Sequence, residues 1–242
     1  MLFYMVMRLD KLLAHYGIGT RKEVKKYIKK GYVKVNSQII KKDDFKVDIM
    51  HDTITFQDES IYYQPFVYLM LHKPAGCVCA TKDNVHQTVI DLIEGYENYD
   101  LFPVGRLDKD TEGLVILTND GDFAHKLLSP NRHHAKLYYA HINARITDED
   151  IQAFHDGVVI DGYRCFPAHL SLIKNYDELS EVTIEIFEGK FHQIKRMFQA
   201  LGKRVVYLKR IKIKSLKLDP CLKLGEYREL SDDELFDLKK NL

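Results

Sequence analysis

Residues 105–121 read GRLDKDTEGLVILTNDG, and in this stretch three acids precede an apolar run. The run LVIL at 114–117 predicts a buried strand. The acids Asp108, Asp110 and Glu112 stand at alternate positions just before that strand. Acids in such a place can hold a metal, cap a helix, face water or take part in catalysis. Spacing alone does not decide among these roles, so the rest of the chain must be considered.

A calcium site is one alternative for these acids. The segment DKDTEG at 108–113 has acids at positions 1, 3 and 5 and glycine at position 6, as an EF-hand loop has. The twelfth position requires a Glu but is Asn119 here, and positions 7 to 10 are the apolar run Leu-Val-Ile-Leu. A glycosidase-like carboxylate pair has no stronger support. The chain contains no P-loop, G-x-G-x-x-G, G-x-S-x-G or HExxH motif, and we expect neither a metal nor a cofactor.

Segments with strand character outnumber helical segments from residue 67 onward. They do not alternate regularly with helices, so we expect an α+β domain over 67–242 with a mainly antiparallel, mixed sheet flanked by helices. Strands are expected at 77–81, 181–189 and 205–218, and helices at 86–93, 121–130, 148–158 and 191–202.

The preceding residues 7–56 predict a smaller unit of two helices and a small sheet. Thr20, followed three residues later by a Glu, has the pattern of a capping box for a helix over 21–31. The segment YVKVNSQII at 32–40 alternates like a hairpin about an Asn-Ser turn. We interpret 57–66 as the linker between the two domains.

Basic residues concentrate in two blocks, although the net charge is only +1. Between Arg8 and Val47 there are twelve Lys or Arg and four Asp or Glu, and between Lys190 and Lys217 there are ten Lys or Arg and no acid. Segregated charge of this kind favours a polyanionic partner such as nucleic acid over two merely solvated faces.

Cysteine usage and hydropathy favour a cytoplasmic protein. No apolar run approaches the ~18–20 residues of a membrane span, and the N-terminal MLFYMVM lacks the features of a signal peptide. The four cysteines form no CxxC pair, so buried reduced thiols are favoured over a zinc site. The pair His133-His134 lies beside an Arg and a Lys, which favours RNA contact or solvation over metal binding.

Several motifs carry resemblances to known families. RLDKLLA and TRKEVKKYIKKGYVKVN resemble the S4 RNA-binding domain, with Ser37 replacing the usual Gly. GRLDKDTEGLVILTNDG resembles the catalytic motif of the RsuA family of ribosomal RNA pseudouridine synthases. Further blocks that resemble this family, each in the expected order, are LHKPAGCVCAT at 71–81 with His72 replacing Asn, KLYYAHI at 136–142 and EGKFHQIKRMFQALG at 188–202.

The resemblance implies an enzyme that breaks the N1–C1′ bond of a uridine in RNA, turns the base and rejoins it through C5, without a cofactor. It assigns Asp108 the role of the catalytic carboxylate, which acts either as a nucleophile or as a base. It also implies that a cation from Lys195 or Arg196 keeps this carboxylate ionised. Tyr138 matches the family tyrosine, with Tyr139 as the competing assignment. Arg106, two residues before Asp108, is a candidate to fill the place that the everted uridine leaves in its stack or to hold a phosphate.

The expected partner is ribosomal RNA, either free or within an assembling small ribosomal subunit. We expect the protein to be a monomer. The motifs are closest to those of the 16S rRNA enzyme. The alternatives are a 23S rRNA enzyme of the same family, a non-catalytic RNA-binding or ribosome-assembly protein, and a metal-dependent hydrolase. The residues expected to contact RNA are Arg8, Arg21, Lys22, Lys25, Lys26, Lys73, Arg132, His133, His192, Gln193, Lys203, Arg204, Lys209 and Arg210.

Overall fold

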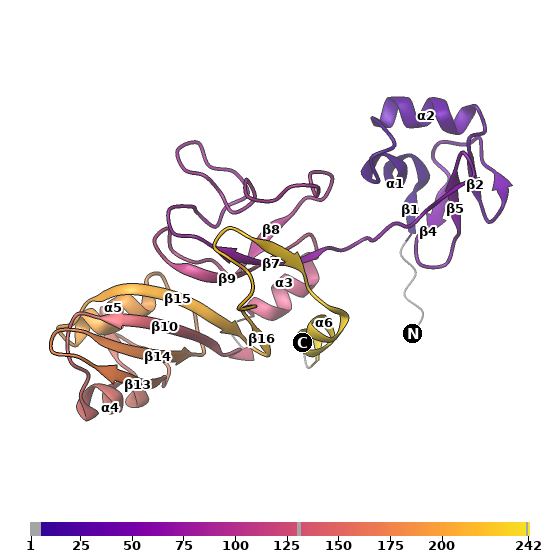
Figure 1. Cartoon of the computed structure of the whole chain (residues 1–242). Helices are drawn as coiled ribbons and strands as arrows, with labels where there is room; N and C mark the ends of the chain where they lie inside the picture. The colour runs from indigo at the N-terminus through magenta and orange to yellow at the C-terminus, as the bar shows by residue number, and fades with distance from the viewer. Residues whose placement is uncertain (1–5, 130–131, 241) are drawn as a thin grey trace. The chain divides into compact units, whose positions relative to one another are not determined.

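The computed structural model describes residues 6–129, 132–240 and 242 (Figure 1). The chain divides into two compact units. The first contains the residues up to Phe66 together with Tyr96–Asp100, and the second contains Val67–Gly95 and Leu101–Leu242. Across the described residues, no helix has the length and apolar character required to cross a membrane.

The first unit packs two helices against short strands. Its core is formed by apolar residues of the helices and strands, among them Leu9, Leu12 and Ile28, all fully buried. Strands β1 and β4 form an antiparallel pair, and the other strands form a four-stranded sheet in the order β3-β2-β5-β6. The bounds are β1 Val6–Arg8, α1 Leu9–His15, α2 Arg21–Lys29, β2 Val33–Val35, β3 Gln38–Ile39, β4 Lys46–Asp48, β5 Ile54–Phe56 and β6 Glu59–Ile61.

Local sequence signals explain two features of this unit. The Thr20 side chain accepts a hydrogen bond from the backbone N–H of Glu23, whose carboxylate accepts one from the Thr20 backbone N–H, so the predicted capping box begins α2. Asn36 and Ser37 both have positive φ, at 48° and 67°, as a tight hairpin turn requires. Strand β6 lies inside the predicted linker and pairs with β5, so that part of 57–66 belongs to the sheet.

The second unit is built on a nine-stranded mixed sheet, flanked by helices (Figure 1). Its main order is β13-β14-β10-β15-β9-β7-β17, with β16 paired to β15 and β8 paired to β9. All of these pairs are antiparallel except β15 with β9, which is parallel. The predicted α+β class with a mainly antiparallel sheet is therefore confirmed.

The elements of this unit follow from the hydrophobic pattern. Strand β9 is buried from Gly113 to Thr118, which confirms the buried strand expected at 114–117. The strands are β7 Tyr68–Lys73, β8 Phe102–Val104, β9 Glu112–Thr118, β10 Lys136–Ile142, β11 Val159–Ile160, β12 Tyr163–Arg164, β13 His169–Asn175, β14 Ser180–Ile186, β15 Val205–Ile213, β16 Leu216–Lys217 and β17 Tyr227–Glu229. The helices are α3 Gly121–Leu128, α4 Asp148–Asp156, α5 Gln193–Ala200 and α6 Asp232–Lys239.

Two expectations between β7 and β8 are wrong. No strand forms at 77–81 and no helix forms at 86–93. Instead, the backbone N–H of Val78 donates to the carbonyl oxygen of Gln87, and Val89 donates back to Val78. This pairing between the two segments, followed by a turn in which the Ile93 N–H donates to the Ile90 carbonyl oxygen, replaces the local helical preference of the second segment.

Candidate active site

Asp108 lies in the loop that joins β8 to β9. The backbone N–H of Thr111 donates to the Asp108 carbonyl oxygen at 3.1 Å, and that of Gly76 donates to Lys109 at 2.7 Å. The N–H of Leu107 also contacts the Sγ of Cys79 at 3.3 Å. These backbone bonds fix the shape of the loop and leave the Asp108 side chain partly exposed, at 24%.

Lys195, in the first turn of α5, brings a cation to this loop. Its Nζ lies 3.1 Å from Asp108 Oδ2 and 2.5 Å from Asp110 Oδ1. Burial alone would lower the pKa of Lys195, but the hydrogen bonds to Asp110 and Asp108 outweigh burial and raise it. Burial likewise opposes the ionisation of Asp110, yet the Lys195 ammonium leaves the pKa of Asp110 lowered. The arrangement therefore favours a charged lysine beside ionised Asp110.

Arg196 turns away from this cluster. Its guanidinium contacts the carboxylate of Asp161, in the turn between β11 and β12. Successive residues of a helix point about 100° apart, so only one of the two cations of α5 faces Asp108. The sequence left the choice open, and the structure brings Lys195 to the site. Asp110, the second partner of Lys195, was considered from the sequence only with the metal, capping and surface alternatives and was not assigned to the active site.

His192 is the other neighbour of Asp108. Its Nε2 lies 3.6 Å from Asp108 Oδ1, and its ring stacks on that of Phe191 with centroids 3.8 Å apart. His192 was expected to contact RNA, and it remains partly exposed beside the carboxylate. Its backbone φ of 50° is in the left-handed region, which is costly for a residue with a Cβ.

The two tyrosines of β10 lie on opposite faces of the sheet, as strand alternation predicts. The Tyr139 hydroxyl is occupied, because it donates to Glu181 Oε2 at 2.7 Å. Tyr138 is buried at 7% exposure and stands opposite Arg210 of β15 in the register. Arg210 in turn stands opposite Gly113 of β9. Tyr138 and Gly113 therefore occupy the same register position on the two strands that flank β15, near the start of β9.

The expectation that Arg210 contacts RNA is wrong. Its side chain is 1% exposed. Its Nε donates to the carbonyl oxygen of Leu114 at 2.8 Å and its Nη2 to that of Gly105 at 2.9 Å. A buried guanidinium needs such acceptors, and these two lie on either side of Asp108 in the chain. Arg210 therefore holds the two ends of the loop together instead of facing solvent.

Lys73 is a second correction of the same kind. It is fully buried at the end of β7, and burial lowers its pKa. Its Nζ donates to three backbone carbonyl oxygens, those of Pro74 at 3.0 Å, Lys109 at 3.3 Å and Thr111 at 2.8 Å. Two of the three belong to the loop just after Asp108. Lys73 thus stabilises the loop through its backbone carbonyl oxygens and is not available to RNA.

Gln193 and Lys203 are also engaged inside the protein. Gln193 is 4% exposed, and its amide bonds to the backbone N–H of Lys190 and to the Glu188 carboxylate. Lys203 pairs with Asp150 at 2.6 Å, where both side chains are largely buried. The expectation that either residue contacts RNA is therefore wrong. The predicted RNA-contact residues of this unit that are exposed are Arg132, His133 and Arg204, while Lys209 is half-buried.

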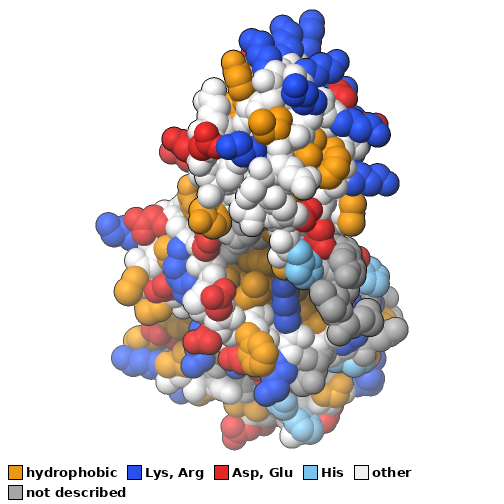
Figure 2. All heavy atoms as spheres, turned by 90° about the vertical axis from the view of Figure 1, so that its right-hand side faces the viewer, with side chains coloured by type: hydrophobic (Ala, Val, Ile, Leu, Met, Phe, Trp, Pro, Cys, Tyr) orange, Lys and Arg blue, Asp and Glu red, His pale blue; other side chains and the backbone are white. Residues whose placement is uncertain are grey.

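In the first unit, the predicted basic face includes a buried acid. Asp10 is fully buried, and ion pairs join it to Arg8 at 3.0 Å, Arg21 at 3.1 Å and Lys25 at 3.8 Å. Burial opposes the charge of Asp10, but these arginines leave its pKa lowered. Lys22 and Lys26 are exposed on α2. Figure 2 shows Lys and Arg side chains gathered at the upper end, the height at which α2 lies in Figure 1.

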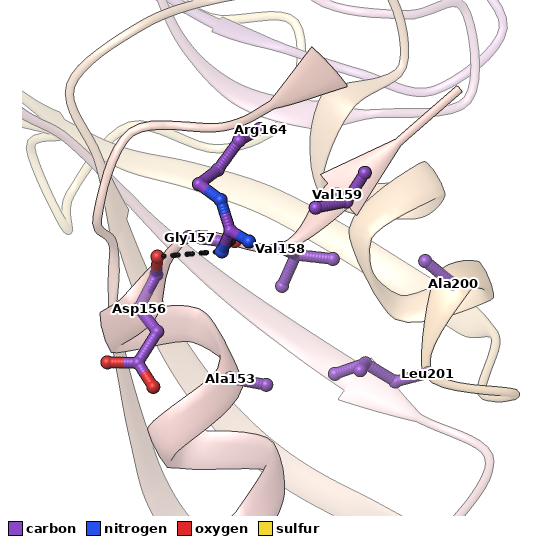
Figure 3. Close-up of a pocket in the computed structure, with 8 residues that line it drawn as sticks. All are labelled: Ala153, Asp156, Gly157, Val158, Val159, Arg164, Ala200 and Leu201. Atoms are coloured by element: carbon purple, nitrogen blue, oxygen red, sulfur yellow. Dashed lines mark hydrogen bonds between the residues drawn. The ribbon is translucent and has the colours of Figure 1, made fainter. Parts of the chain in front are cut away.

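A separate cavity of about 250 Å³ lies at the far end of α5, and it shares no lining residue with the Asp108 cluster (Figure 3). Arg164 at its edge donates to the carbonyl oxygens of Asp156 and Gly157. The lining residues are Ala153, Asp156, Gly157, Val158, Val159, Arg164, Ala200 and Leu201. The cavity offers no carboxylate–cation pair like that of Asp108.

The chain thus has two units of different kinds, a small one of two helices and short strands and a larger one whose mixed-sheet domain carries a carboxylate–lysine pair. The model of the S4 domain matches residues 7–54, and that of RNA pseudouridylate synthase matches residues 67–200. The chain belongs to the RsuA family of pseudouridine synthases, isomerases that convert uridine in RNA to pseudouridine.

Relatives align with nearly the whole chain. An uncharacterized RNA pseudouridine synthase, YtzG of Bacillus subtilis, is 46% identical over 95% of this chain and 97% of its own length. The ribosomal small subunit pseudouridine synthase A of Haemophilus influenzae is 37% identical over 97% of this chain and 100% of its own. A crystal structure of a pseudouridylate synthase superimposes with a TM-score of 0.67 at 36% identity, covering 96% of this chain and 99% of the other.

Proposed function

We propose that this protein isomerises one specific uridine of 16S rRNA and that Asp108 is its catalytic carboxylate. The contact between Lys195 Nζ and Asp108 at 3.1 Å is the observation that carries the catalytic assignment. The choice of 16S rRNA is supported by relatives named ribosomal small subunit pseudouridine synthase A, at 37% identity in Haemophilus influenzae and in Vibrio cholerae. It is further supported by the motif at 188–202, where His192 and the Lys195-Arg196 pair resemble the 16S enzyme, since the large-subunit enzymes usually carry an Arg-Arg pair and often lack the His.

The reaction needs few groups, because nothing enters or leaves the nucleoside overall. The N1–C1′ bond breaks, the base turns, C5 bonds to C1′, and the proton lost from C5 is balanced by one gained at N1. In this proposal Asp108 acts either as a nucleophile or as the base that yields a glycal intermediate. The Lys195 ammonium pairs with the Asp108 carboxylate. The Tyr138 ring stacks on the turning base, where its hydroxyl takes part in removing the C5 proton.

The target uridine must leave its stack before Asp108 can reach the sugar, which costs a few kcal/mol. Arg106 is exposed and lies two residues before Asp108. We assign Arg106 to the space that the uridine vacates, or to a phosphate beside it. The S4 unit holds the RNA outside the active site through phosphate contacts, which fix position but carry little sequence information. The protein acts as a monomer in the cytoplasm, on free rRNA or an assembling small subunit.

The test is to map pseudouridine by carbodiimide adducts and primer extension after incubation with unmodified 16S rRNA, 23S rRNA and small-subunit particles. Wild-type protein should modify one 16S uridine, and Asp108→Asn should bind the RNA but leave it unmodified. Modification of 23S rRNA instead would reassign the substrate. Modification by Asp108→Asn would remove Asp108 from the mechanism, and binding without any turnover would favour the non-catalytic alternative. An arm in excess EDTA separates this isomerase from a metal-dependent hydrolase.

A further inference from the structure

An exposed pair of stacked rings stands beside the candidate carboxylate. Phe191 is 71% exposed, and its ring lies on that of His192 with centroids 3.8 Å apart and an interplanar angle of 19°. The other ring of the pair approaches Asp108, because His192 Nε2 is 3.6 Å from Asp108 Oδ1. Phe191 is therefore separated from the carboxylate by one ring, and it presents a large apolar surface to solvent.

The segment that carries these rings is held in place by hydrogen bonds, two of them partly buried. Gln193, which is buried, accepts from the Lys190 backbone N–H at 3.0 Å and donates to Glu188 at 2.8 Å. Arg196 donates to the carbonyl oxygen of Phe191 at 3.4 Å. His192 itself adopts the left-handed backbone conformation, which a non-glycine residue holds only where its surroundings fix it. The exposed ring is thus presented by an organised turn.

The chemistry of this surface suits a nucleobase. Every base has a π-face that stacks on an aromatic ring, while the surrounding cations attract the phosphates. Lys195 and Arg196 follow on the same helix, and the ammonium of Lys190 lies 3.3 Å from the ring centroid of Tyr163. A ring that is exposed, flat, stacked on a second ring and bordered by cations has the properties of an RNA-stacking surface.

We propose that Phe191 and His192 form a stacking platform for the nucleobase that neighbours the target uridine in the RNA. Tyr138 on β10 is assigned to the uridine itself, whereas Phe191 lies one ring farther out than His192 and receives the adjacent base. This inference rests on the proposed function, because it takes the Asp108 loop as the place where the uridine is bound.

Steady-state kinetics on the mapped rRNA fragment provide the first test. Phe191→Leu keeps an apolar side chain but removes the flat ring, and Phe191→Tyr keeps the ring. Stacking on one aromatic is worth about 1–3 kcal/mol, so Phe191→Leu should raise KM about 5- to 150-fold with little change in kcat. Phe191→Tyr should resemble wild type. The matched control is Phe236→Leu on α6, where an equally exposed ring, at 69%, should be replaceable without effect.

Fluorescence of 2-aminopurine tests the platform without requiring catalysis. The probe is placed in turn at positions within the 16S rRNA fragment that the Asp108→Asn protein protects from nuclease. At one position, bound protein should quench the fluorescence, Phe191→Leu should abolish the quench, and Phe191→Tyr and Phe236→Leu should retain it. A quench that persists in Phe191→Leu, or no quench at any position, would overturn the platform. Failure of the proposed function would instead appear as unmodified RNA with wild-type protein.

Discussion

The ammonium of Lys195 lies 3.1 Å from the carboxylate of Asp108 and reaches it from a different element of the fold, the first turn of α5. The same ammonium also binds Asp110 at 2.5 Å, so one cation is shared by two acids of the loop. Asp110 is 74% exposed, whereas Asp108 is 24% exposed, and the latter is the better shielded partner of the lysine.

Removing this cation should remove most of the activity. We expect Lys195→Met to lower kcat about 10²- to 10³-fold, the usual cost of losing one preorganised charge at a reacting group. Arg196→Met is the matched control, because the adjacent arginine pairs with Asp161 instead. Single-turnover rates on saturating rRNA provide the measurement, and equal losses in the two variants would show that Lys195 has no special relation to Asp108.

Arg106 should matter most where the uridine has to be extracted from a helix. Its side chain is exposed and lies on the same loop as Asp108. We expect Arg106→Ala to reduce kcat/KM on structured rRNA by about 10- to 100-fold more than on an unpaired fragment with the same uridine, because unstacking costs a few kcal/mol. Arg132→Ala is the comparison, because this exposed arginine is given no role in eversion and its effect on kcat/KM should be the same on both RNAs. Equal losses on both RNAs would exclude a role of Arg106 in eversion.

Local signals in the sequence were sufficient for much of the fold. The capping box of α2 and the apolar run of β9 depend on neighbouring residues only, and both form as predicted. The helix predicted at 86–93 does not form because the backbone of this segment pairs with Val78, about ten residues earlier, a contact that the helical pattern within the segment does not specify.

The candidate site was predicted in part. Motif resemblance pointed to Asp108. Lys73 and Arg210 were predicted to be exposed RNA contacts, because a basic residue in a chain with concentrated positive charge is usually found at the surface. A signal was present in each case. Lys73 ends a strand that is buried at every position. Arg210 lies two residues after buried Leu208 on the same strand, so the two side chains point to the same face of the sheet. Their carbonyl partners, however, come from distant parts of the chain and are visible only in the fold.

Gly113 should tolerate no side chain. Its φ is +110°, and a Cβ there would lie 2.2 Å from the backbone oxygen of Arg210, where β9 and β15 run in parallel. We expect Gly113→Ala to destabilise the protein by roughly 3–5 kcal/mol, in the range of severe core and backbone substitutions. Gly121→Ala has open space around it and serves as the control in urea unfolding. Similar midpoints for the two variants would contradict the close strand approach.

Lys136 should make stability depend on alkaline pH. Burial, followed by the charge of Arg210, lowers its pKa to about 8 from the ordinary 10.5. Between these values the unfolded chain binds more protons than the folded one, so this group makes the free energy of unfolding rise with pH. Lys136→Gln should lack that rise. Urea unfolding at about pH 7.5 and 9.5 gives the comparison, and an identical pH dependence in both proteins would exclude this assignment.

The S4 unit should contribute a salt-dependent and largely sequence-independent part of RNA binding. Lys22 and Lys26 are exposed on α2, whereas Arg8 and Arg21 share their charge with buried Asp10. Removal of one lysine–phosphate interaction should reduce the slope of log K against log salt by about 0.7–0.9. We therefore expect Lys22→Gln with Lys26→Gln to flatten the slope by up to twice that amount, while kcat at saturating RNA stays near wild type. Lys126→Gln, an exposed lysine on α3, is the control. An unchanged slope in the double variant would place the principal RNA contacts elsewhere, because neutral glutamines cannot release counterions from phosphate.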